Sequence, residues 1–359
     1  MKIVLTGYYG SDNIGDELLF QAIKNMVLKY IPSADLFGLG CFPRRATELH
    51  GIPFANNTGW WNVETQKKPA FAKGEEETLK GCDLLILGGG GLLGNDCLYS
   101  FPSVEKINAD GGKIFAMGIG CDPFFSNSPE IDKYFKKFTF MSGRDSWSVS
   151  NLSKAGAINP ILSFDSVFSL FPEEIHNSSE KIGLILTTFR RWDNYEKRLE
   201  IISEKLKHSE KQIEIYPWSP ILCGDYDWSR SMELFEKYMP WATIVDTRAR
   251  RFEDVWDDFK QYGTIISDRY HAILLGILQN KPTLSIAMDS KQREIAKMLG
   301  LPWIDPLIEI GALERSFNLV VAEIENNKIE IIEKTHSGCN LAKRKWAETE
   351  LKFKELVRC

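Results

Sequence analysis

The sequence predicts an α/β protein with two Rossmann-like domains that face each other across a cleft. The chain has 359 residues, of which 43% are hydrophobic, and this length suggests two domains of ordinary size. Short apolar runs alternate with helical segments, which is typical of parallel βαβ units. The alternation stops in a polar stretch at Glu173–Glu180 and then resumes. We therefore expect domains at 1–174 and 175–335, with segment 336–359 returning to the first domain as a helix.

The first domain is expected to begin with a buried strand, a glycine-rich loop and a helix. The strand is Lys2–Thr6, the loop is Gly7–Gly15, and the helix runs over Asp16–Tyr30, where Pro32 follows. The stretch Asn56–Pro69 is predicted to be a polar loop. Further strands are predicted at Asp35–Leu39, Asp83–Leu87, Lys113–Gly118, Phe138–Met141 and Ile161–Phe164.

The second domain is expected to repeat this scheme. Its strands are predicted at Ile182–Thr187, Ile213–Tyr216, Thr243–Val245, Thr264–Ser267 and Thr283–Ala287. The tail Leu341–Arg358 has apolar residues near one face of a helix, which predicts that it packs against the first domain.

Composition excludes several function classes. The net charge is −5, without the clustered basic excess that nucleic-acid binding needs. The seven cysteines are scattered, which favours reduced thiols in the cytoplasm over a disulfide framework. No apolar run reaches the roughly 18–20 residues of a membrane span, and the N-terminus reads as a strand rather than a signal peptide. We expect a cytoplasmic protein that can still act at the inner membrane surface.

The segment Ser267–Lys291 carries the strongest functional signal. It predicts a strand, a short turn, a helix and a second strand, with Arg269 and His271 at the first strand-to-helix turn. Ligands bind beyond the carboxyl ends of strands in open α/β sheets, and helix N-termini attract anions there. An arginine that can grip a carboxylate or phosphate, two residues from a titratable histidine, indicates a reaction centre for an anionic substrate.

Three other stretches lie at predicted strand ends. Gly7–Glu17 has the context of a phosphate-cradling loop, although it lacks the known fingerprints, and a simple βα turn remains the alternative. Gly88–Asp96 allows a close approach of the backbone to a ligand or to a packed helix. Gly143–Ser148 contains Arg144, which is open to a binding role, and Asp145, for which an internal ion pair is the favoured interpretation.

Other histidines and metal sites give no signal. His50, His176, His208 and His336 are interpreted as surface or linker residues. No His, Cys, Asp or Glu cluster has metal-ligand spacing, so we expect no obligatory metal and no cofactor.

These elements, in this order, resemble the polysaccharide pyruvyl transferases. The resemblance rests on Gly15-Asp16-Glu17, Gly88–Leu93, Gly118–Gly120, the Arg-Asp of Gly143–Ser148, and the Ser-x-Arg-x-His of Ser267–His271. Pro282–Ile286 and Asp289–Lys291 complete it, and the Ser-x-Arg-x-His block is its most specific part. The sequence differs at Cys121-Asp122, which stand between Gly120 and Pro123 where such proteins usually have proline at once.

The resemblance implies a fold similar to the GT-B glycosyltransferases and phosphoenolpyruvate as co-substrate. The acceptor would be a hexose of a cell-surface glycan or its lipid-linked precursor, and the product a cyclic pyruvate ketal. His271 would then be the acid/base residue, and Asp16 either a base or a helix cap. The donor-binding residues would be Ser267, Arg269, Tyr270, Arg144 and Lys291. Acceptor-binding residues would be Asn13, Gly15, Gly90, Gly91, Asn95 and Asp96.

Two other functions stay open. A glycosyltransferase with a nucleotide-sugar donor would have the same fold and would use Arg269 and Lys291 for the diphosphate. A non-catalytic glycan- or anion-binding protein would have the side chains of Arg269 and His271 turned into the core. If the acceptor is lipid-linked, we expect exposed apolar residues to make peripheral membrane contact, with Trp60, Trp61, Phe124 and Phe125 as candidates.

Overall fold

A computed structural model describes residues 1–171, 179–187, 195–218, 228–248, 251–287, 289–305 and 310–358. The predicted domain boundary at 174/175 and His176 lie outside these ranges. The chain forms two compact units. The first comprises Met1–Ser11, Asp16–Leu170 and Ala342–Cys359, and the second comprises Asp12–Gly15 and Phe171–Leu341.

The first unit is built on a seven-stranded parallel sheet with the order β3-β2-β1-β5-β7-β8-β9. Its strands are β1 (Lys2–Thr6), β2 (Asp35–Gly40), β3 (Phe54–Asn56), β5 (Leu84–Leu93), β7 (Lys113–Cys121), β8 (Phe140–Gly143) and β9 (Ile161–Leu162). The strand order reverses between β1 and β5, which makes the carboxyl ends of these two strands the switch point where ligands bind in such sheets.

Alternate residues of the central strands face two separate cores. On β1, Ile3 and Leu5 point to a core shared with α1 (Ile14–Tyr30), whereas Val4 points to the opposite core. The helices of the opposite face are α3 (Glu75–Leu79), α4 (Phe101–Ala109), α5 (Pro129–Phe135) and α6 (Ser146–Lys154). Helix α2 (Pro43–His50) precedes β3. The strands β4 (Trp60–Asn62) and β6 (Cys97–Tyr99) form a separate two-stranded antiparallel sheet.

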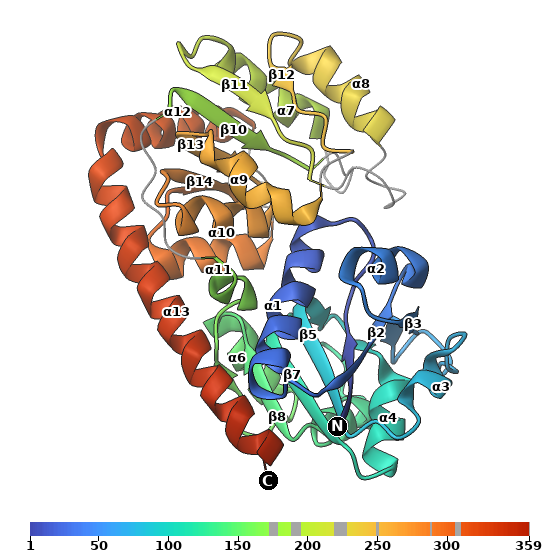
Figure 1. The fold of residues 1–359 in the computed structure, drawn as a ribbon. Coiled ribbons are helices and arrows are strands. Elements are labelled where there is room, and N and C mark those ends of the chain that lie inside the picture. Colours follow the sequence, from blue (N-terminus) through green and yellow to red (C-terminus); the bar gives the residue numbers. More distant parts are fainter. Residues whose placement is uncertain are drawn as a thin grey trace. The chain divides into compact units, whose positions relative to one another are not determined.

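The long helix α13 (Lys328–Arg358) ends in the first unit, as the amphipathic tail predicts (Figure 1). Trp346 and Phe353 belong to the core that α1 covers. Glu350 accepts a hydrogen bond from Trp346 Nε1 at 3.0 Å and pairs with Lys29 at 2.6 Å. The C-terminal helix therefore completes one face of the first sheet.

The second unit repeats the same strand order in a six-stranded parallel sheet, β12-β11-β10-β13-β14-β15. Its strands are β10 (Lys181–Ile185), β11 (Gln212–Ile215), β12 (Thr243–Ile244), β13 (Thr264–Ser267), β14 (Thr283–Ile286) and β15 (Trp303–Ile304). Its helices are α7 (Tyr195–Lys207), α8 (Trp228–Tyr238), α9 (Val255–Lys260), α10 (Tyr270–Leu278), α11 (Ser290–Leu299) and α12 (Ile310–Asn326). Two short 3₁₀ turns, Ser166–Ser169 and Phe252–Asp254, lie before β10 and α9. The switch point of this sheet lies between β10 and β13.

One predicted strand is too short, and one predicted loop is wrong. The strand predicted at Asp83–Leu87 continues as β5 through the glycine run to Leu93. The stretch Asn56–Pro69, predicted to be a polar loop, contains β4, and Trp61 packs into the core with only 5% of its surface exposed. None of the helices within the described ranges is both long and apolar enough to cross a membrane.

Candidate functional site

The turn after β13 is held in shape by Ser267. Its hydroxyl donates to Ile185 O on β10 at 3.0 Å and accepts the N–H of Arg269 at 2.8 Å. Arg269 is the N-cap residue of α10 and gives that helix no side-chain cap. The first turn of α10 therefore begins at the switch point of the second sheet, where a helix N-terminus attracts an anion.

Tyr270 and His271 form the first turn of α10. Their rings lie 5.2 Å apart at 90°, and both residues are largely buried. The segment Asp12–Gly15 belongs to the same compact unit, and a side chain on Gly15 would overlap the His271 ring. A glycine is therefore required at position 15 for His271 to keep this position.

Asp268 is a site residue that the sequence analysis did not select. Its two carboxylate oxygens accept the N–H of Thr187, which follows β10, at 2.8 and 2.9 Å. Only 3% of the residue is exposed. Burial raises the pKa of this carboxyl to about 7, and the positive charge of Arg269 opposes the shift. A group that titrates near neutral pH thus adjoins Arg269.

Gln292 joins this turn to the next strand end. Its amide donates to Asp268 O at 2.6 Å, and its Oε1 accepts the N–H of Asp289 at 2.9 Å. Asp289 caps α11 by accepting the N–H of Lys291 at 3.1 Å and also pairs with the Lys291 ammonium at 3.0 Å. One chain of hydrogen bonds therefore links the ends of β10, β13 and β14. Arg269 directly follows Asp268 in this chain, and Lys291 is bonded to Asp289.

In the first unit, the glycine-rich loop after β1 is organised by Glu17. Its carboxylate accepts the N–H of Gly10 at 3.0 and 3.2 Å and lies 2.7 Å from His50 Nε2. Both side chains are essentially inaccessible, at 1% and 0%. The prediction that His50 is a surface or linker residue is therefore wrong. A buried carboxylate needs hydrogen-bond partners, and the buried ring of His50 supplies one for Glu17.

Asn13 and Asp16 lie at the start of α1. The helix begins at Ile14, and Asn13 Oδ1 accepts the N–H of Gly15 at 3.2 Å, so Asn13 stands in the capping position. Asp16 is in the first turn, and its Oδ1 lies 3.6 Å from the position of a Cβ on Gly90. Asp16 and Gly90, which the sequence analysis selected from different motifs, therefore lie close together.

The glycine run on β5 serves two purposes. A side chain on Gly88 would meet Tyr9, whose hydroxyl donates to Gly88 O at 2.6 Å, and one on Gly89 would meet Leu19. These two glycines allow close packing of the first loop and α1 on the sheet. Gly90 and Gly91 instead lie beside Asp16 and Arg144.

Arg144 follows β8 and is 6% exposed. A side chain on Gly120 would overlap its guanidinium, and Gly91 also leaves room for it. Its Nε lies 3.4 Å from Asp145, which caps α6 by accepting the N–H of Ser148 at 2.6 Å. The ion pair expected for Asp145 is present, and Arg144 lies at the carboxyl ends of β5, β7 and β8.

Asn95 and Asp96 contact the loop after β7. Asp96 Oδ1 accepts the N–H groups of Phe125 and Ser126 at 2.9 and 2.8 Å, and Asn95 Nδ2 donates to Asp122 at 3.3 Å. Both residues therefore shape the stretch in which Cys121-Asp122 depart from the family pattern.

A profile of the polysaccharide pyruvyl transferases matches residues 13–290. The chain belongs to the polysaccharide pyruvyl transferase family. The matched range includes Arg144, Arg269 and His271 and ends one residue before Lys291. None of the curated protein sequences compared with the chain matches it.

Solved structures with a similar fold have low sequence identity to the chain, and three of them contain UDP or UDP-GlcNAc. Anabaena Alr3699/HepE in complex with UDP has a TM-score of 0.60 and 11% identity, with all of both chains covered. The S. aureus MnaA–UDP structure has a TM-score of 0.59 and 10% identity, covering 93% of this chain and 90% of that one. UDP-GlcNAc 2-epimerase from Neisseria meningitidis, bound to UDP-GlcNAc, has a TM-score of 0.57 and 12% identity, covering 98% and 100%. At this identity the similarity shows the fold alone, and it confirms the predicted GT-B-like fold class.

Proposed function

We propose that this pyruvyl transferase moves the enolpyruvyl group of phosphoenolpyruvate onto a hexose of a cell-surface polysaccharide or its free or lipid-linked precursor. The product is a cyclic pyruvate ketal, and phosphate is released. The observation that carries the proposal is the Arg269–His271 turn, which begins α10 at the switch point of the second sheet. A guanidinium, a helix N-terminus and an imidazole within three residues suit a small anionic donor that needs a proton.

The donor carries a carboxylate and a phosphate on three carbons. Arg269 and the N–H groups at the start of α10, from Tyr270 onward, can neutralise these charges without reorganisation because Ser267 and Asp268 fix the turn. Lys291 is the weaker candidate since Asp289 already pairs with it. Arg144, a buried guanidinium in the first unit, is a further candidate for donor binding.

The reaction needs one proton at carbon and two hydroxyl oxygens at C2. A proton added to the methylene carbon creates the methyl group and makes C2 electrophilic. A sugar hydroxyl then adds to C2 and loses its proton, and the C2–O bond to phosphate breaks. A second hydroxyl closes the ketal, and its proton leaves on the released phosphate. His271 can donate the first proton and accept the proton of the first hydroxyl, and Asp16 is the candidate base that takes the proton of the second hydroxyl and passes it to the released phosphate.

The acceptor is proposed to bind the first unit, where Asn95 and Asp96 act through the loop that they hold and Gly90 and Gly91 leave the backbone open. Asn13 and Gly15 are also proposed to bind the acceptor, and the segment that holds them belongs to the second unit. If the acceptor is lipid-linked, contact with the inner membrane surface would use Trp60 and Phe125, which are exposed, rather than the buried Trp61.

The alternative donor is a nucleotide sugar, which is favoured by the UDP bound to structures of the same fold. Thermal unfolding separates the two donors because a ligand that binds only the folded protein raises the melting temperature. We expect phosphoenolpyruvate, but no UDP-sugar, to raise it by several degrees at about 100 times the dissociation constant. The shift should vanish in Arg269→Ala and persist in Arg251→Ala, an exposed arginine of the same unit. A shift that survives Arg269→Ala, or one given only by UDP-sugars, would sink the donor assignment.

A further inference from the structure

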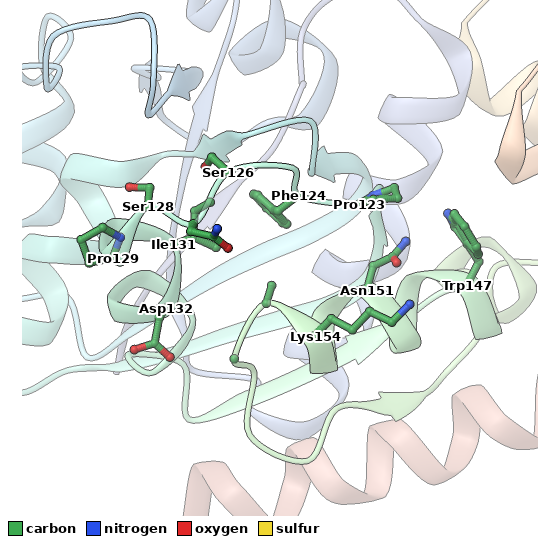
Figure 2. Close-up of a pocket in the computed structure, with 13 residues that line it drawn as sticks. Pro123, Phe124, Ser126, Ser128, Pro129, Ile131, Asp132, Trp147, Asn151 and Lys154 are labelled. Atoms are coloured by element: carbon green, nitrogen blue, oxygen red, sulfur yellow. The ribbon is translucent and has the colours of Figure 1, made fainter.

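A cavity of about 530 Å³ opens in the first unit beside the loop that follows β7 (Figure 2). Its volume lies in the range of about 300–1,000 Å³ that small-molecule sites occupy. The floor and walls come from the β7–α5 loop, α5 and α6. Aromatic rings, amides, hydroxyls and two charged side chains line the cavity. The lining residues include Phe124, Asn127, Asp132, Trp147, Asn151 and Lys154.

One face of α6 supplies the main contacts. Trp147, Asn151 and Lys154 are spaced four and three residues apart, so they lie on the same side of the helix. Figure 2 shows all three rising from α6 on the side of the β7–α5 loop. Trp147 is 40% exposed, which is unusual for so large an apolar side chain. An aromatic face is therefore available to a flat apolar surface.

On this face of α6, a hydrogen bond fixes the amide of Asn151, whereas the polar groups of Trp147 and Lys154 are available to a ligand. Asn151 is buried and its Nδ2 donates to Cys121 O at 2.9 Å, so the amide orientation is set and Oδ1 points away from that bond. Within the ranges that the structure describes, the indole N–H of Trp147 and the ammonium of Lys154 have no hydrogen-bonding or ionic partner. A ligand can thus take both donors without displacing a protein contact.

The opposite wall is held by the residues at the end of β5. Asp96 Oδ1 accepts from Phe125 and Ser126, which fixes the loop across the cavity, and Ser128 caps α5 by accepting the N–H of Glu130 at 3.3 Å. Because these hydrogen bonds already order the site, less binding free energy is lost in ordering it when a ligand binds.

We propose that this cavity is a carbohydrate subsite in which one pyranose ring of the glycan stacks on Trp147 while Asn151 and Lys154 bind its hydroxyls. A pyranose has an apolar face and a rim of hydroxyls, which matches an aromatic platform edged by an amide and an ammonium. Among the described residues that line the cavity, Lys154 is the only cation. One cation is too few for a diphosphate, so a sugar fits better than a nucleotide. The inference rests on the proposed function because it makes the bound glycan the acceptor.

The test is titration calorimetry and saturation-transfer NMR with cellotetraose, mannotetraose and N-acetylchitotetraose, without phosphoenolpyruvate. We expect at least one to bind, and Trp147→Ala to weaken that binding about tenfold, the effect of losing one aromatic contact. Trp147→Phe should keep most of the affinity. Ile158→Ala, which removes an apolar side chain that is 63% exposed outside the cavity, should change nothing.

Equal binding by wild type and Trp147→Ala, or no binding of any tetrasaccharide, would overturn the subsite. Binding of UDP that depends on Trp147, without sugar binding, would overturn it in favour of a nucleotide. Since the donor is absent from the titration, a failed donor assignment leaves the result intact. Sugar binding at Trp147 with no phosphoenolpyruvate-dependent transfer would instead count against the proposed function alone.

Discussion

Asp268 shows how a single side chain can control the charge of the candidate site. Its carboxylate binds the backbone N–H of Thr187, 81 residues away in sequence, and is the direct neighbour of Arg269. Burial raises its pKa to about 7, so at neutral pH the group is close to half protonated. An anionic donor at Arg269 would disfavour the ionised form further, because like charges repel.

The raised pKa predicts a pH-dependent stability. The ordinary aspartate pKa is about 3.9, so between about pH 4 and 7 the folded protein holds a proton that the unfolded chain releases. The stability that this proton contributes is complete below about pH 4 and is lost as the pH rises through 7. Between about pH 4 and 7 the free energy of unfolding of the wild type should therefore fall by on the order of 4 kcal/mol relative to that of Asp268→Asn.

Urea unfolding at several pH values measures this difference. Asp35→Asn, which changes an exposed aspartate in the first unit, is the control and should run parallel to the wild type. If Asp268→Asn also runs parallel to the wild type, the carboxyl is ionised throughout. In that case Asp268 would act only as a fixed acceptor for Thr187.

At the scale of elements, the loop between β1 and α1 depends on a buried pair that spans α1 and α2. Glu17 holds Gly10 and His50 at once, so Glu17→Ala leaves a buried imidazole and a buried backbone N–H without this partner. Leaving a buried polar group without its hydrogen-bond partner costs about 1–3 kcal/mol for each group, so two such groups cost several kcal/mol. We expect a loss of this size by urea unfolding. Glu17→Gln should lose less because an amide oxygen still accepts from Gly10.

Glu48→Ala supplies the matched control, since Glu48 is an exposed glutamate of α2 that pairs with Arg44 at the surface. Its loss should stay within about 1 kcal/mol, as for other surface ion pairs. Equal losses for Glu17→Ala and Glu48→Ala would show that the loop does not depend on the buried pair.

The sequence predicts most elements because their signals are local. Continuous apolar runs mark β1, β7 and β13, and helical spacing marks α1, whose observed start differs from the prediction by two residues. The extension of β5 through four glycines was not predictable from propensity, since glycine disfavours strands. Tyr9 and Leu19 occupy the space that those side chains would take, and this packing is visible only in the folded chain.

The residues of the candidate site also differ in whether the sequence could predict their positions. The position of Arg269 and His271 at a strand-to-helix turn was predictable because the apolar run of β13 and the start of α10 adjoin them in sequence. Asp268, Gln292 and His50 were not selected, because their roles depend on partners 81, 24 and 33 residues away. Distance along the chain, rather than residue type, therefore limited what the sequence could predict of the site.

At the scale of the whole molecule, the same strand order occurs twice, each time with its own core and its own switch point. The two switch points carry different chemistry. The second has Arg269, His271 and the start of α10, whereas the first has the glycine-rich strand β5, Asp16 and Arg144. The Trp147 cavity also belongs to the first unit. This difference favours donor binding by the second unit and glycan binding by the first.

Hydrogen–deuterium exchange with each ligand alone tests that division. Phosphoenolpyruvate should slow exchange of the amides at 268–275, because the N–H groups at the start of α10 would bond its phosphate or carboxylate. A tetrasaccharide that binds should slow exchange at 122–132 and 146–156, around Trp147. Arg269→Ala should abolish only the first effect and Trp147→Ala only the second. Protection by phosphoenolpyruvate confined to the ends of β5 and β8 would transfer the donor role from Arg269 to Arg144, because those strand ends surround the Arg144 guanidinium.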